Sequence, residues 1–123
     1  MRALRRRELF RISAADVLDS LTVQDVGNAL TDIADATIAG ALDAAIAEME
    51  RARGAPLPTR ILVIGMGRYG GGEIGYGSDA DVVFVHDPLP GQDEREATAA
   101  AALVVNEVRS LLNAPSPDPP LQL

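Results

Sequence analysis

The sequence of 123 residues has a formal net charge of −7 and is 47% hydrophobic and 3% aromatic, with neither Cys nor Trp. This length suits one small domain or part of a larger one, and the hydrophobic content is too high for an intrinsically disordered chain. The acidic charge argues against nucleic acid as a partner, because binding a polyanion requires Lys and Arg to displace counterions.

The absence of Cys excludes disulfide bonds and thiolate metal sites, and nothing in the composition points to an oxidising compartment. No apolar run approaches the ~20 residues that span a bilayer, and no signal-peptide core follows the first residues. We therefore expect a cytoplasmic protein with no membrane partner.

The first part of the chain is rich in helix signals. An arginine cluster opens it in a helix-like stretch, and we interpret this cluster as a solvated helix face, with an anion site as the alternative; its members are Arg2, Arg5, Arg6, Arg7 and Arg11. Two Ser/Thr-x-x-acid spacings then predict two helix starts, one at Ser13 with Asp16 and one at Thr22 with Asp25.

From Val23 onwards the apolar residues recur at helical spacing, which predicts one long amphipathic helix. It should end near Arg53, because Gly54 suits a left-handed cap and the prolines at 56 and 58 cannot continue a helix. We accordingly divide the chain into a helical segment, residues 1–54, and a second segment, residues 55–123.

Two short runs rich in β-branched residues, 60–64 and 81–86, predict strands, the first of them buried. A helix should follow from a cap at Asp93 to Asn113, with an apolar face that includes Leu111 and Leu112. Residues 115–120 predict an extended proline-rich linker, and residues 121–123 predict the beginning of a third strand. Because a sheet that stopped there would be unfinished, we interpret the chain as a truncated domain.

Residues 65–70, Gly-Met-Gly-Arg-Tyr-Gly, match the G-x-G-x-x-G turn of dinucleotide-binding folds, and Asp87 stands where such folds place a ribose-binding acid. Residues 68–78 contain five glycines, however, and each costs about 1 kcal/mol inside the crossover helix that such a fold requires. We therefore predict a flexible, backbone-exposed loop or one short turn of helix, in which free amides bind nucleotide phosphates. A glycine turn without a ligand is the alternative.

The loop is followed by Asp79-Ala80-Asp81. If these residues open the second strand, both carboxylates point to one face, with Ala80 and Val82 towards the core. Two like charges side by side favour a shared divalent cation with oxygen ligands, for which Mg²⁺ is the natural candidate. A lone D-x-D is common, whereas a glycine loop followed eleven residues later by D-x-D is far more specific.

Gly67 and the D-x-D at 79–81 together resemble the metal-binding signature of DNA-polymerase-β-type nucleotidyltransferases. More narrowly, residues 65–81 are similar to the loop of glutamine-synthetase adenylyltransferases, and the similarity extends to residues 5–9 and 118–121. The resemblance implies an α+β fold in which N-terminal helices pack on an incomplete, polymerase-β-like mixed sheet with a following helix.

The same resemblance implies transfer of AMP from ATP to a tyrosine of glutamine synthetase, with a second domain that removes it and a PII-type nitrogen-signalling protein as a further partner. The sequence of residues 72–81 is more similar to that of the family's C-terminal, adenylylating domain. The implied residues are Asp79 and Asp81 as catalytic Mg²⁺ ligands and, around the ATP phosphates, Gly67, Arg68, Gly70, Gly71 and Ser78.

The family's third carboxylate is expected on the next strand, beyond Leu123, and this sequence does not contain it. We therefore predict that the chain alone is inactive or nearly so. Two other functions remain open: another small-substrate or protein nucleotidyltransferase, such as a uridylyltransferase or an aminoglycoside-modifying enzyme, and a non-catalytic nucleotide-binding or helical interaction module.

Overall fold

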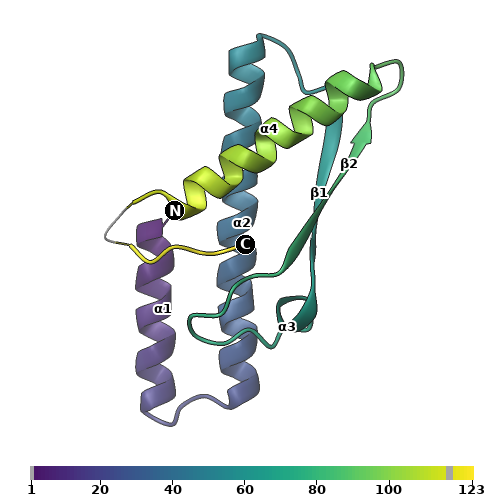
Figure 1. Ribbon diagram of the computed structural model, residues 1–123. Helices are drawn as coiled ribbons and strands as arrows, with labels where there is room; N and C mark the ends of the chain where they lie inside the picture. The colour runs from purple at the N-terminus through teal and green to yellow at the C-terminus, as the bar shows by residue number, and fades with distance from the viewer. Residues whose placement is uncertain (1, 116–117) are drawn as a thin grey trace.

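The computed structural model describes residues 2–115 and 118–123 (Figure 1). Two helices, α1 (Arg2–Val17) and α2 (Val23–Arg53), form an antiparallel pair. They are followed by β1 (Thr59–Gly65), the short α3 (Gly67–Gly70), β2 (Val82–Pro88) and α4 (Glu94–Asn113). Helix α4 crosses α2 and also packs against both strands, so the fold is α+β as predicted.

Both ends of α2 lie where the sequence predicts them, because local signals set them. Thr22 Oγ1 accepts a hydrogen bond from the amide of Asp25 at 3.2 Å, and the Asp25 carboxylate accepts one from the amide of Thr22 at 2.9 Å. This reciprocal pair satisfies two amides that the first turn of a helix leaves without partners. At the other end Gly54 takes φ 68°, the left-handed conformation of a helix cap.

The helix start predicted at Ser13 is wrong. Helix α1 runs without interruption from Arg2 to Val17, and Ser13 lies inside it. The spacing of Ser13 and Asp16 is the same as in a capping box, but alanines 14 and 15 are strong helix formers that let the preceding turn continue. The spacing marks a helix start only when the chain before it is not already helical.

The core lies between α2 and α4 and is built from small and branched aliphatic side chains. Ala41 and Ala45 of α2 are fully buried, as are Val104 and Val108 of α4, and the small alanines let the two helices approach closely. Leu111 was predicted on this face but is 38% exposed, whereas its neighbour Leu112 is 1% exposed. The buried cluster includes residues from both sides of the predicted division at residue 54.

The two strands are antiparallel, with Leu62 opposite Val85 and Ile64 opposite Val83. An antiparallel pair cannot come from a βαβ unit, which confirms the rejection of the dinucleotide-binding alternative. The prediction that the first strand is buried is wrong, because the helices cover only one face of the hairpin. On the other face Leu62 is 60% exposed.

Residues 121–123 do not form the predicted third strand, so the sheet has two strands within the described part of the chain. Leu121 is nevertheless buried, and the carbonyl of Gln122 accepts a hydrogen bond from the amide of Ala80 at 2.9 Å. The predicted linker at 115–120 includes residues 116 and 117, which lie outside the described residues. None of the helices described here combines the length and apolar composition needed to cross a bilayer.

Candidate nucleotide and metal site

The glycine-rich segment folds back on itself at the end of β1. Helix α3 is a single turn that brings Gly70 against the carbonyl of Gly65: a Cβ placed on Gly70 would lie 2.4 Å from that oxygen. Gly71 follows, and a Cβ there would meet nothing closer than 3.5 Å. The lack of space therefore requires glycine at position 70 but not at position 71.

The segment forms the short turn of helix that was one of its two predicted forms, but the prediction that the amides of Gly70 and Gly71 are free is wrong. These amides donate to the carbonyls of Met66 and Gly67 at 2.8 and 3.1 Å, because the helical turn uses them in its own hydrogen bonds. The amides that a helical turn leaves without an intrahelical acceptor are those at its start, residues 67–69. A role for Gly70 and Gly71 in phosphate binding stays a prediction, and it would require the turn to open.

The beginning of the turn and the second carboxylate of the D-x-D meet. The amide of Met66 donates to the carbonyl of Asp81 at 2.8 Å, which continues the pairing of β1 with β2. Gly67 takes φ 53°, and a Cβ on it would lie 3.2 Å from Asp81 Oδ2. Glycine therefore both allows the left-handed backbone and leaves room for the Asp81 carboxylate above it.

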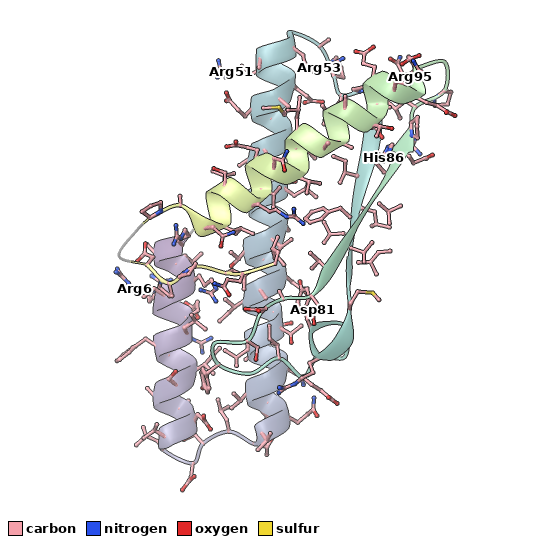
Figure 2. All side chains as sticks on the ribbon, viewed as in Figure 1. Arg6, Arg51, Arg53, Asp81, His86 and Arg95 are labelled. Atoms are coloured by element: carbon pink, nitrogen blue, oxygen red, sulfur yellow. The ribbon has the colours of Figure 1, made fainter. Side chains whose placement is uncertain are left out.

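Asp79, Ala80 and Asp81 precede β2 and do not open it as predicted. The alternation that the prediction needed is still present, because Asp79 and Asp81 are exposed and Ala80 is completely buried between them. Figure 2 shows Asp81 where the chain leaves the glycine-rich segment and enters β2. Both carboxylates are thus accessible to solvent, with a buried alanine between them.

Two exposed carboxylates with one residue between them fit a hard cation that takes oxygen ligands. Mg²⁺ commonly uses one or two carboxylates and completes its coordination with water and substrate phosphates. Among residues 2–115 and 118–123, no group of three His, Cys, Asp or Glu side chains lies close enough to hold a metal. A metal site at Asp79 and Asp81 stays a prediction, and within the described residues these two carboxylates would be its protein ligands.

Arg68 and Ser78 contact the loop itself. Arg68 Nε donates to the carbonyl of Glu73 at 3.2 Å, and Ser78 Oγ accepts a hydrogen bond from the amide of Gly75 at 3.3 Å. Both side chains brace residues 73–78, the stretch that leads into the D-x-D. The Ser78 hydroxyl retains its own hydrogen for donation.

Tyr69 was not singled out from the sequence, yet it anchors the turn to α2. Its ring is 7% exposed and its hydroxyl donates to Asp35 Oδ1 at 2.5 Å. Burial first, and then Asp35, raises the pKa of the Tyr69 phenol well above its usual range. Both residues line a cleft of about 750 Å³ between α2 and the end of β1, which Asp79 and Asp81 do not line.

Tyr76, the other tyrosine of the glycine-rich segment, is exposed. Its ring is 47% exposed and its hydroxyl donates to Asp16 Oδ2 of α1 at 3.3 Å. The packing of the helices therefore decides which of the two tyrosines is buried.

An antiparallel hairpin backed by helices, with a glycine turn and an exposed D-x-D at one end, is consistent with the incomplete α+β nucleotidyltransferase-like fold that the resemblance implies. The sequence profile of the glutamate-ammonia ligase adenylyltransferase family matches residues 1–122. The chain belongs to this family.

Relatives include two bifunctional glutamine synthetase adenylyltransferase/adenylyl-removing enzymes. That of Streptomyces coelicolor is 50% identical, over 98% of this chain and 13% of that protein. That of Mycolicibacterium smegmatis is 52% identical, over 99% of this chain and 12% of that protein. The chain thus spans about an eighth of the length of these relatives.

Proposed function

We propose that this chain supplies the nucleotide-binding and metal-binding part of an adenylyltransferase that moves AMP from ATP to a tyrosine of glutamine synthetase. The observation that carries the proposal is the meeting of Gly67 with Asp81: a Cβ on the glycine would lie 3.2 Å from the carboxylate oxygen. Family membership and the names of the relatives support the acceptor.

In this reaction the acceptor's tyrosine oxygen forms a bond to the α-phosphorus of ATP while the bond to pyrophosphate breaks. The hydroxyl proton leaves to a base or to water, and pyrophosphate carries away the electron pair of the broken bond. Mg²⁺, when bound, neutralises charge on the phosphate oxygens and lowers the proton affinity of the attacking oxygen.

The residues of this chain hold and orient the reactants. Asp79 and Asp81 present exposed oxygen ligands, and Gly67 keeps the space beside Asp81 free of a side chain. The amides at the start of α3 and the hydroxyl of Ser78 are donors for phosphate oxygens. Arg68 braces residues 73–78 through its hydrogen bond to the carbonyl of Glu73. We also propose that its guanidinium binds the phosphates of ATP.

Nucleotide and metal binding by the 123-residue chain test the proposal. Asp79→Asn and Asp81→Asn should each weaken Mg²⁺-dependent binding of ATP at least tenfold, measured by calorimetry, because each removes a charged ligand while keeping the side-chain shape. Asp87→Asn is the matched control, since Asp87 is an exposed carboxylate at the far end of β2. ATP binding that is equally strong in all three variants would contradict the proposal.

Base choice separates this proposal from a uridylyltransferase, which would bind UTP in preference to ATP in the same assay. We also expect the 123-residue chain by itself to adenylylate glutamine synthetase at a negligible rate, because its described residues supply two carboxylates. A rate near that of a whole relative would refute this expectation. The PII-type partner, the assignment to the adenylylating domain and the cytoplasmic location stay predictions.

A further inference from the structure

Three arginines of α1 contact the proline-rich segment that follows α4. Arg2 donates through Nη1 to the carbonyl of Ala114 and through Nη2 to the carbonyl of Asp118, the latter at 2.8 Å. Arg5 Nη1 donates to the carbonyls of Pro119 and Pro120 at 3.0 and 3.2 Å. Arg6 Nη1 lies 2.8 Å from Asp118 Oδ1 (its position is labelled in Figure 2).

These contacts have a chemical reason in the segment's composition. Proline has no amide hydrogen, so residues 119 and 120 offer carbonyl oxygens but no donors, and they cannot be held by an ordinary β ladder. A guanidinium group has five N–H donors and no acceptor, which makes it a suitable partner for several carbonyls. We call the three side chains of Arg2, Arg5 and Arg6 the arginine clamp.

The arginine clamp contradicts the interpretation of the cluster as a wholly solvated helix face. Arg7 and Arg11 fit that interpretation, because they are exposed and pair with Glu8 on their own helix. Arg5 is half-buried, and burial, followed by the charge of Arg2, lowers the pKa of its guanidinium. A partly desolvated cation with two carbonyl partners is a structural contact as well as a surface charge.

The segment held by the arginine clamp leads directly to the D-x-D. Leu121, next to Pro120, is 3% exposed, and the carbonyl of Gln122 accepts the amide of Ala80 at 2.9 Å. Ala80 is the residue between the two candidate metal ligands. Helix α1 is therefore connected to the D-x-D through three successive contacts. The guanidinium of Arg5 binds the proline carbonyls, Leu121 is buried in the core, and the carbonyl of Gln122 accepts the amide of Ala80.

We propose that Arg2, Arg5 and Arg6 are positioning residues for the metal site, holding residues 118–122 so that Gln122 bonds to Ala80 and keeps Asp79 and Asp81 on one side. This inference rests on the proposed function, since it assigns the arginines a purpose at that site. The three arginines act through the backbone of residues 118–122 and do not contact the metal or the nucleotide.

Two measurements on the 123-residue chain test the inference: hydrogen exchange at the Ala80 amide, and Mn²⁺ affinity followed by electron paramagnetic resonance. Arg5→Ala should speed exchange at Ala80 at least tenfold and weaken Mn²⁺ binding about threefold or more. Arg11→Ala is the control, because it removes the same charge from the same helix at a residue that pairs with Glu8 of that helix, and it should change neither value.

Lysine substitutions give a sharper test. Arg5 uses one nitrogen for both carbonyls, so Arg5→Lys should restore most of the Ala80 protection and of the Mn²⁺ affinity. Arg2 needs two nitrogens to reach the carbonyls of Ala114 and Asp118, so Arg2→Lys should behave like Arg2→Ala. If an α1 variant fails to fold, Asp118→Asn removes the ion pair with Arg6 from the other side and should weaken both values in the same direction.

Three results would overturn the inference. In the first, exchange at Ala80 is unchanged in Arg5→Ala; in the second, amides throughout α2 and α4 speed up as much as Ala80, which indicates a general loss of stability. In the third, Ala80 loses protection while Mn²⁺ affinity stays the same. Mn²⁺ binding that is indifferent to Asp79→Asn contradicts the proposed function itself, whereas Mn²⁺ binding that needs Asp79 but ignores the arginines contradicts only this inference.

Discussion

Helix α2 and the glycine-rich segment at 66–81 lie against each other, yet they are held in shape by opposite means. The helix is defined by the side chains it has: the Thr22 and Asp25 cap at one end and a buried aliphatic stripe along its length. The segment is defined by side chains it lacks. Gly70 sits on the carbonyl of Gly65, and Gly27 of α2 leaves room for the carbonyl of Gly72, which a Cβ would approach to 2.9 Å.

This difference explains where each region tolerates change. A helix face loses stability when buried volume is removed, because the cavity forfeits contacts on all sides. A segment built from backbone contacts loses its shape when volume is added, because a carbonyl cannot move aside as a flexible side chain can. The candidate site thus depends on close backbone contacts, which added volume disrupts. Four substitutions distinguish this packing from that of the helix face.

The largest expected effect comes from Leu112→Ala in α4. Leu112 is 1% exposed, so its truncation should lower the free energy of unfolding by about 2–5 kcal/mol, measured by urea denaturation. Leu62→Ala on the uncovered face of the hairpin, where the side chain is 60% exposed, should change it by less than about 0.5 kcal/mol. Equal losses in the two variants would mean that the uncovered face is buried in solution.

Gly70→Ala should destabilise the chain by about 1–3 kcal/mol and distort the turn, because the new methyl group would overlap the Gly65 carbonyl. The next residue gives a matched control. At Gly71 the backbone has φ −88° and there is ordinary space for a Cβ, so Gly71→Ala should be neutral or slightly stabilising. A neutral Gly70→Ala, with unchanged amide shifts for residues 66–72, would contradict this account of the turn.

Tyr69→Phe should cost about 0.5–1.5 kcal/mol at neutral pH by removing the hydrogen bond to Asp35. The raised pKa of Tyr69 means that its contribution is fully present below the unfolded pKa of about 10 and is lost as the pH rises towards the folded value. The difference in free energy of unfolding between the original chain and Tyr69→Phe should therefore become smaller above about pH 10, measured by urea denaturation at a series of pH values. Tyr76→Phe, at an exposed site, should show a smaller cost, and a gap for Tyr69→Phe that widens with pH would contradict the assignment.

The smallest expected effect is on the cap of α2. Thr22→Ala should lower stability by about 0.5–1 kcal/mol, because the amide of Asp25 loses its acceptor. The hydrogen bonds from Thr22 also lower the pKa of Asp25. In the unsubstituted chain, the stability that these bonds give is therefore present above the pKa of Asp25 in the unfolded chain, and it is lost as the pH falls through the pKa of Asp25 in the folded chain. The difference between the two proteins should shrink in acid, as measured by circular dichroism at 222 nm during denaturation. A difference that grows in acid would show that Asp25 is not the partner.

The elements that local chemistry controls were predicted closely. Both ends of α2 and the Asp93 cap of α4 follow from short-range signals, because each cap depends on residues within four positions. Ser13 shows the limit of such signals, since the same spacing occurs inside a continuing helix. The D-x-D was found from spacing, but its place before β2, and not inside it, depends on pairing with Met66 and Gln122.

The sequence by itself determined that this is a helix-rich α+β chain with a glycine-rich segment that ends in a D-x-D, because helical periods, caps and short motifs are local properties. Only the tertiary structure decided that Tyr69 and not Tyr76 is buried, and that Arg2 and Arg5 bind carbonyls more than a hundred residues away. Those contacts join residues distant in the chain, and they exist only once the helices have packed and set which groups face each other.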